Sequence, residues 1–339
     1  MKKKLIFFVQ AICFLAILAA VFSPLRQLMA RKSLVGVWNM TEKVGGFYNE
    51  PQNEFDLMFF GSSHIYASIA PMRLWEDTGV KSYVFATQQQ PAWATYTYLK
   101  EALKSQSPRL VVVECQMLLH DEDYYEEGVT YSYMDDLRFS WDKVQLAWHS
   151  APTMEERVEL LCNYIKYHVR WSELTKEDYA FDPKALRDPL KGYVQLWDTP
   201  DPQPRPNIDE ITGRAALTEK NERWLREIIA LCQERGIELW LIKAPSNLLE
   251  EEKLRLNTIG DTAAEYGVMF HDFNEDYAAV GLTPDRFYDA HHLDAWGAAA
   301  FTDYFAEYLT ERYDLPRHPD DPQWKLDAAV YDEALQKDE

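Results

Sequence analysis

A serine in one short segment and an aspartate–histidine pair in another are residue types used in nucleophilic catalysis. Ser63 follows Gly61-Ser62 at the end of an apolar run. Glycine permits a tight turn that can leave the next serine hydroxyl exposed, and such a hydroxyl needs a base to become a nucleophile. Asp289 and His292 are three residues apart. The carboxylate can therefore contact the imidazole, fix its tautomer and leave the other ring nitrogen for a serine.

Both segments adjoin a pattern of alternating strands and helices. The predicted strands are Phe55–Phe60, Ser82–Ala86, Arg109–Cys115, Glu238–Ile242 and Val268–Phe273. Helices are expected from Pro71 onward, at 93–104, at 218–235 with Thr218 as N-cap and Gly236 as the stop, at 250–266 and at 295–313. This alternation predicts a parallel sheet covered on both faces, with the active site where the carboxyl ends of the strands meet the loops.

The remaining parts of the chain differ in composition from this α/β domain, which we place at 55–313. Residues 118–213 are aromatic, acidic and too long for a plain loop, so we expect a mostly helical insertion packed over the Ser63 side of the sheet. Residues 26–54 read as a connection with a turn at Gly45-Gly46. Residues 314–339 read as a loosely held acidic tail.

An uncharged run from Leu5 to Phe22 predicts a membrane anchor within residues 1–25. Eighteen helical residues span roughly 27 Å, close to the thickness of a bilayer's hydrocarbon core. A cleaved signal peptide is the alternative, although no small-x-small cleavage site follows the run. Basic residues flank the run on both sides, so charge does not settle its orientation. Its likeness to a signal sequence favours a single-pass protein with its body outside the cytoplasm.

Charge and cysteine content exclude several classes of protein. The net charge is −20, and six of the 35 basic residues lie within 1–32, which leaves 29 against 55 acidic residues in the body. So acidic a body argues against binding nucleic acid. Cys13 lies in the apolar run, and Cys115, Cys162 and Cys232 lack the spacing of a disulfide framework or a zinc site. We expect neither a metal nor a cofactor.

A G-[DS]-S motif after the first strand, together with D-x-x-H-[LP] before the last helix, resembles the SGNH/GDSL hydrolase superfamily. The matching residues are Gly61-Ser62-Ser63, Asp289 to Leu293, and Gly297 in the following helix. The G-S-S form, the N-terminal run and the insertion look most like the bacterial cell-envelope branch. That branch includes the D-alanyl transfer protein of lipoteichoic acid synthesis and proteins of alginate or peptidoglycan O-acetylation. The resemblance covers 55–117 and 218–312, and implies a three-layer α/β/α flavodoxin-like fold with about five parallel strands.

The resemblance also implies a function. Ser63 would be the nucleophile, His292 the base and Asp289 its orienting acid. The reaction would be hydrolysis or transfer of an acyl group, in this branch acetyl, on cell-envelope polysaccharide. The partners would be that polysaccharide, an acyl donor and a multi-spanning membrane O-acyltransferase.

The chain departs from the superfamily in its oxyanion hole. A glycine after the second strand and an asparagine after the third are both missing where they are expected. The hydrogen-bond donors near these positions are Thr87, Gln89, Gln90 and Gln116, and a fixed amide could serve in their place. The same departure supports an alternative, a non-catalytic protein of this fold that binds or assembles envelope glycan or a membrane acyltransferase.

A few further residues, near these motifs or in the insertion, are candidates for supporting the site or for contacting substrate. His64 beside the serine is expected to pack or support the site. Lys243 and Asn247 after the fourth strand are candidate substrate contacts. Within the insertion, the segment His168–Trp171 either contacts substrate or has a structural role.

Overall fold

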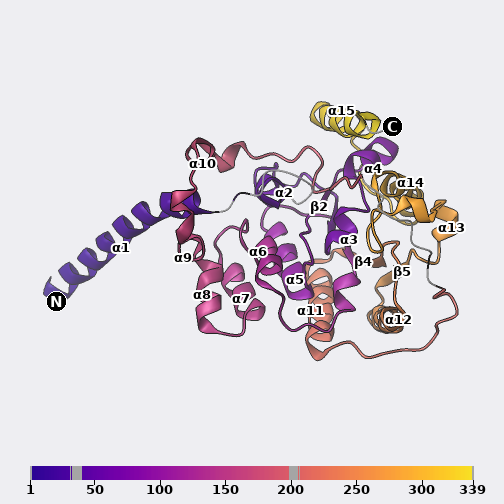
Figure 1. Cartoon of the computed structure of the whole chain (residues 1–339), viewed down its shortest axis with the longest axis horizontal. Coiled ribbons are helices and arrows are strands. Elements are labelled where there is room, and N and C mark those ends of the chain that lie inside the picture. The colour runs from indigo at the N-terminus through magenta and orange to yellow at the C-terminus, as the bar shows by residue number, and fades with distance from the viewer. Residues whose placement is uncertain (1, 31, 33–39, 198–204, 206, 338–339) are drawn as a thin grey trace.

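A computed structural model describes residues 2–30, 32, 40–197, 205 and 207–337. Its centre is a five-stranded, all-parallel sheet with the strand order β2-β1-β3-β4-β5 (Figure 1). The strands are β1 (Leu57–Phe60), β2 (Ser82–Val84), β3 (Leu110–Glu114), β4 (Glu238–Lys243) and β5 (Met269–Asp272). The predicted α/β class and the five predicted strands are confirmed.

The interior strands β1 and β3 are buried along their whole length, which explains their continuous apolar sequences. Leu57 pairs with Leu110 and Phe59 with Val112, and no residue of β1 or β3 is exposed. A strand covered on both faces has no reason to alternate apolar and polar side chains.

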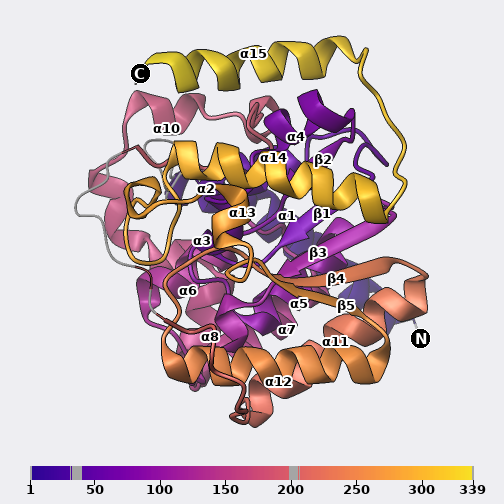
Figure 2. The same ribbon diagram turned by 90° about the vertical axis from the view of Figure 1, so that its right-hand side faces the viewer.

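Helices cover both faces of the sheet (Figure 2). The helices on one face are α4 (Pro71–Thr78) and α14 (Ala295–Arg312). Those on the other are α5 (Ala92–Ala102), α11 (Glu219–Arg235) and α12 (Glu250–Tyr266). The short helices α3 (Ser63–Tyr66), α13 (Tyr277–Val280) and η4 (Pro284–Arg286) lie in loops between these elements. The Thr218 hydroxyl caps α11 by accepting the N–H of Asn221, and Gly236 ends it, as predicted.

The stretch expected as an insertion is helical only in part. Its helices are η1 (Gln116–Leu118), α6 (Glu127–Met134), α7 (Trp141–Ser150), α8 (Met154–Leu161), α9 (Asn163–Lys166), η2 (His168–Ser172), α10 (Lys176–Ala180) and η3 (Pro183–Ala185). Helix α7 packs on α5, at the side of the domain. Residues 191–196 begin in a turn at Lys191-Gly192 and belong to the α/β body, because the N–H of Val84 donates to the Lys191 carbonyl and the N–H of Ala295 to that of Leu196.

Residues 26–54 are not a simple connection with a turn at Gly45-Gly46. Both glycines lie inside helix α2 (Met40–Phe47), whose Phe47 stacks on Phe85 in the core with ring centroids 4.0 Å apart. A Cβ on Gly46 would come within 3.0 Å of the Asp188 nitrogen. The two glycines therefore allow residues 186–188 to approach the helix closely. The interpretation of Gly45-Gly46 as a turn missed this close contact.

The described part of the predicted tail 314–339, which ends at residue 337, is not loosely held either. It contains helix α15 (Pro322–Lys337), which packs on α4. Trp324, Ala328 and Tyr331 lie on one face of α15 and are buried. Most acidic residues of this amphipathic helix lie on its outer face, and the buried Asp327 pairs with Arg187 and Lys191.

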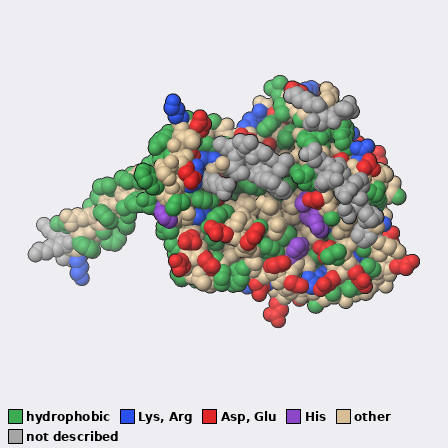
Figure 3. All heavy atoms as spheres, viewed as in Figure 1, with side chains coloured by type: hydrophobic (Ala, Val, Ile, Leu, Met, Phe, Trp, Pro, Cys, Tyr) green, Lys and Arg blue, Asp and Glu red, His purple; other side chains and the backbone are tan. Residues whose placement is uncertain are grey.

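Helix α1 (Lys2–Met29) projects from the body (Figures 1 and 3). Within the described residues it is the one helix long and apolar enough to cross a membrane, over Lys4–Phe22. Its apolar side chains are exposed along almost the whole span.

Candidate active site

Ser63 is placed by a turn that requires glycine. Gly61 has φ +145°, and a Cβ there would lie 3.0 Å from Cβ of Glu114. The chain then enters α3 with Ser62 as N-cap and Ser63 as the first helical residue. The position is the carboxyl end of β1, where the strand order reverses between β1 and β3, which is where open α/β sheets bind ligands.

His292 and Asp289 lie in a tight loop between β5 and α14. Phe287 and Leu293 form an antiparallel bridge across this loop, and the Tyr288 N–H donates to the His292 carbonyl at 2.9 Å. Asp294 ends the loop by capping α14, since its carboxylate accepts the N–H of Gly297 at 2.6 Å.

The structure brings the three predicted catalytic side chains into one hydrogen-bonded chain. Ser63 Oγ lies 2.8 Å from His292 Nε2. His292 Nδ1 lies 2.9 Å from both carboxylate oxygens of Asp289. The base is thus oriented by the acid on one side and contacts the serine on the other, the arrangement that activates a serine hydroxyl.

Asp289 is held in its ionised form. Burial by itself would raise its pKa, but hydrogen bonds from the His292 ring and from the backbone N–H groups of His291 and His292 outweigh it and lower the pKa to about 2. Its Oδ1 accepts those two N–H groups at 2.7 and 2.8 Å. The carboxylate can therefore stabilise a protonated His292 at any physiological pH.

A cavity of about 470 Å³ opens over Ser63 and His292. Its other lining residues are His64, Gln88, Gln89, Gln116, Met117, His120, Glu122, Tyr124, Tyr125, Glu126, Glu252 and His291. The start of the predicted insertion, from His120 to Glu126, thus lines the cavity over the serine. Helix α7 packs on α5 at the side of the domain.

The four predicted oxyanion donors are placed differently. Gln89 and Gln116 line the cavity. The Gln116 amide nitrogen already donates to Glu252 Oε1 at 2.7 Å. Thr87 and Gln90 are fully buried and not among the lining residues; Thr87 donates to Gln90, and Gln90 donates to Thr95. Their hydrogen bonds to each other stabilise the loop after β2, so their positions do not support a role as oxyanion donors.

The side chain next to the nucleophile, His64, belongs to a buried polar network. Lys243 Nζ at the end of β4 lies 3.3 Å from His64 Nδ1, and it donates to Glu114 Oε1 at 2.9 Å. Lys243 is completely buried, so the prediction that it contacts substrate is wrong for this structure. Asn247 does not line the cavity either; its N–H donates to the Ala290 carbonyl in the His292 loop.

The neutral state of His64 follows from its surroundings. Burial, reinforced by the positive charge of Lys243, lowers the pKa of His64 well below its usual value. An ammonium group can only donate, so Nδ1 of His64 is the acceptor and the ring proton resides on Nε2. Among the described residues no group pairs with Nε2, and His64 lines the cavity. Sequence reasoning placed His64 only as a packing or supporting residue; its contact with Lys243 could not be predicted, because the two residues are 179 positions apart.

The segment His168–Trp171 is not among the residues that line this cavity. Arg170 instead donates to the carbonyls of Met29 and Ala30 at the end of α1. Among the described residues, no group of three or more His, Cys, Asp or Glu side chains is arranged to hold a metal ion.

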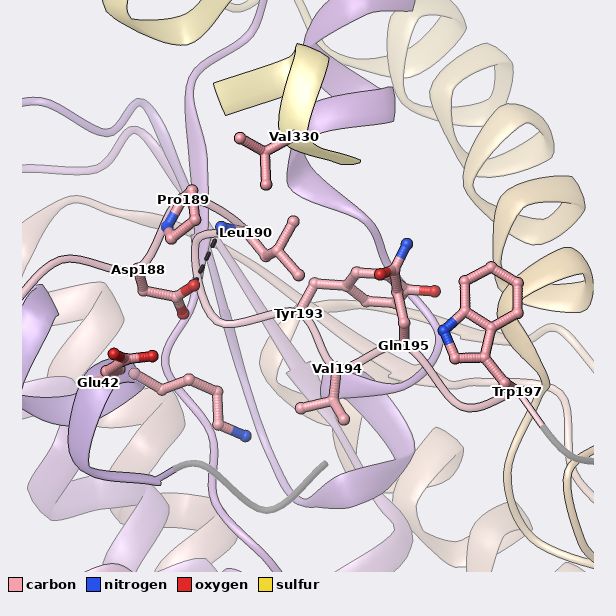
Figure 4. Close-up of a pocket in the computed structure, with 10 residues that line it drawn as sticks. Glu42, Asp188, Pro189, Leu190, Tyr193, Val194, Gln195, Trp197 and Val330 are labelled. Atoms are coloured by element: carbon pink, nitrogen blue, oxygen red, sulfur yellow. Dashed lines mark hydrogen bonds between the residues drawn. The ribbon is translucent and has the colours of Figure 1, made fainter. Parts of the chain in front are cut away.

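A second cavity, of about 390 Å³, lies between α2, the 188–197 segment and α15 and contains no catalytic residue (Figure 4). There the Asp188 carboxylate accepts the N–H of Leu190 at 2.9 Å. Lys43 lines the same cavity, with its ammonium 3.9 Å from the ring centre of Tyr66 and no hydrogen-bond partner among the described residues. Burial lowers the pKa of Lys43 to about 7, against the opposing charge of Asp188.

Comparison with known proteins adds little to this geometry. No protein-family model matches the chain, and no curated protein matches it. Among solved structures, the chain is similar to a gut microbial diltiazem-metabolizing enzyme, at 18% sequence identity and a TM-score of 0.26, over 76% of this chain and 48% of that chain. The chain thus spans about half the length of that structure. A similarity this low carries no conclusion about chemistry.

Proposed function

We propose that the chain is a serine esterase or O-acyltransferase that acts on acyl esters. The observation that carries this proposal is the Ser63–His292–Asp289 hydrogen-bond chain at the floor of an open cavity. A serine, an imidazole and an ionised carboxylate in this order form the arrangement that transfers acyl groups in many unrelated folds.

The reaction would proceed in two halves. Ser63 Oγ attacks the ester carbonyl carbon while His292 Nε2 takes the hydroxyl proton, and a tetrahedral oxyanion forms. The intermediate collapses to an acyl-serine as the leaving alkoxide receives that proton from His292. Water or a sugar hydroxyl then attacks the acyl-serine with His292 again as base, so that hydrolysis and transfer differ only in the acceptor.

The oxyanion needs donors that the superfamily's missing glycine and asparagine would have supplied. The backbone N–H of Ser63 is one, because the first residue of a helix has no intrahelical acceptor. We assign the second to the Nε2–H of His64, which is neutral, held by Lys243 and lines the cavity beside the nucleophile. Gln89 lines the same cavity and is the remaining candidate.

Membrane attachment by α1, with the body outside the cytoplasm, is part of this proposal. The exposed apolar span of Lys4–Phe22 supports it. A tether of this kind would hold the cavity near envelope polysaccharide, an acyl donor or a multi-spanning O-acyltransferase, the partners that the resemblance implies.

Labelling by a fluorophosphonate probe tests the proposal most directly. The intact chain should be labelled, Ser63→Ala should not be, and the intact chain should hydrolyse a small aryl acetate. Binding of envelope saccharide without labelling or hydrolysis would instead identify a non-catalytic binding protein of the same fold.

A further inference from the structure

The end of helix α1 is docked on the α9–η2 part of the chain. Phe22 packs edge to face on Tyr164 of α9, with ring centroids 6.0 Å apart. Further along, Arg170 of η2 donates to the carbonyls of Met29 at 3.0 Å and Ala30 at 2.6 Å. The chain from 164 to 170 therefore follows α1 from Phe22 to its last residue.

This docking fixes the height of α9 and η2 relative to the apolar span. Phe22 is the last residue of that span. The seven residues from Phe22 to Met29 rise roughly 10 Å along the helix. If α1 crosses a bilayer, Tyr164 lies where the hydrocarbon ends, and Arg170 lies roughly 10 Å further out, at the outer boundary of the headgroup layer, which extends about 5–8 Å beyond the hydrocarbon.

The same two elements expose large apolar side chains. Tyr164 is 40% exposed, Ile165 45%, Val169 60% and Trp171 73%. Aromatic and aliphatic side chains at this height are typical of segments that lie in a membrane interface. The guanidinium of Arg170 beside them is paired with Asp178 at 3.1 Å, so it is the apolar side chains and the position of α1 that indicate such an interface.

We propose that Tyr164, Ile165, Val169 and Trp171 form a lipid-contact surface that lies in the headgroup region of the membrane through which α1 passes. The inference rests on the proposed anchoring by α1 and adds a second contact with the bilayer. Its occupant is lipid, since the position of α1 places these side chains at the level of the headgroups.

The lipid-contact surface is connected to the catalytic cavity. Lys166 and Tyr167, between Ile165 and Val169, both hydrogen-bond to Asp135 at the end of α6. Helix α6 begins at Glu127, next to the cavity residue Glu126. Contact with lipid would therefore fix the orientation of the cavity toward the membrane, which a flexible tether alone would not do.

The chain offers a matched control for testing this surface. Trp141 on α7 is 73% exposed, the same fraction as Trp171. Its neighbour Asp142 pairs with Lys100 of α5 and with Lys104 just beyond that helix, which holds this end of α7 on the α/β body and away from α1. A probe at position 141 therefore reports an exposed site outside the proposed surface.

The experiment uses the full chain in phosphatidylcholine nanodiscs. Ile165→Cys, Trp171→Cys and Trp141→Cys each receive an environment-sensitive fluorophore, in a chain where Cys13 and Cys162 are replaced by alanine; Cys115 and Cys232 are buried. Lipids with a nitroxide on the acyl chain or on the headgroup act as quenchers. Position 165 should be quenched by both, position 171 mainly by the headgroup quencher, and position 141 by neither.

Two outcomes would overturn the inference in distinguishable ways. If the chain floats with liposomes but positions 165 and 171 are quenched no more than 141, the lipid-contact surface is wrong and the anchor stands. If the full chain does not float, anchoring and surface both fail. Hydrolysis of an aryl acetate by the same protein reports separately on the catalytic proposal.

Discussion

The Lys243 ammonium lies 3.3 Å from Nδ1 of His64; Lys243 ends β4, and His64 lies in α3, directly after β1. Glu114, at the end of β3 between them, accepts a hydrogen bond from the same ammonium at 2.9 Å. A buried ion pair is weak evidence for stability, but it fixes geometry where both charges are hydrogen-bonded. Here it holds the ring next to the nucleophile in one tautomer.

Replacing His64 tests its role as an oxyanion donor. We expect His64→Ala to lower kcat by about 10²- to 10³-fold with little change in KM, because the donor acts on charge that develops in the transition state. His64→Gln, which keeps an amide donor, should recover part of the loss. A rise in KM at constant kcat would show instead that His64 contributes only to substrate binding.

The catalytic chain should behave as a unit. We expect Ser63→Ala and His292→Ala each to reduce kcat for an aryl acetate by about 10⁶-fold, and the double variant to lose no more than either single variant. Asp289→Asn should cost less, about 10⁴-fold, because serine and base remain in place. Additive losses in the double variant would contradict a shared mechanism.

The sequence was sufficient for the parts of the fold that depend on local patterns. The apolar runs around β1 and β3, the Thr218 cap and the Gly236 stop each correspond to an element at the predicted place. The serine and the aspartate–histidine pair were found because they are adjacent to such elements. That the serine and this pair would meet was implied by the resemblance to the SGNH superfamily, and their spacing alone predicted only the contact between Asp289 and His292.

Features that depend on tertiary contacts could not be predicted. The glycine pair in α2 looks like a turn until the 186–188 chain is seen against it. Helix α15 looks like an acidic tail because its buried Trp324 and Tyr331 are spread over two turns of charged residues. The His64–Lys243 contact has no local signature, since only the sheet brings the two residues together.

Lys43 should reduce the stability of the protein near neutral pH. Its folded-state pKa is about 7 against an ordinary value of 10.5, so between these values the unfolded chain binds a proton that the folded chain does not. Stability therefore rises with pH across this window, and the destabilisation is complete below pH 7. We expect Lys43→Met to raise the free energy of unfolding by about 1–3 kcal/mol at pH 7.

The control for Lys43 is the pH dependence itself. The advantage of Lys43→Met in urea unfolding should shrink steadily from pH 7 to pH 10, as the lysine in the unfolded chain loses its proton. An advantage that stays constant over this range would mean that improved apolar packing, and not removal of a buried amine, stabilises the variant.

The charge around the catalytic cavity should select among substrates. Glu122, Glu126 and Glu252 line it, and the described lining residues include neither lysine nor arginine. Burial lowers the pKa values of His64 and His291, so these rings add no positive charge near pH 7. The cavity is therefore negative, and a carboxylate on the substrate would be repelled.

We expect a neutral aryl acetate to have a higher kcat/KM than its carboxylate-bearing analogue of the same leaving-group strength, by about 10-fold at low salt. Added salt should narrow the gap, because screening weakens repulsion between partly exposed charges. Glu122→Gln should reduce the difference in kcat/KM between the two esters further without changing hydrolysis of the neutral ester, since Glu122 does not contact the catalytic chain.

The control is Glu159→Gln, because Glu159 lines a different cavity. This variant should leave the ratio of the two kcat/KM values unchanged. Equal kcat/KM values for the two esters would show that the acyl group reaches Ser63 along a path that these carboxylates do not face.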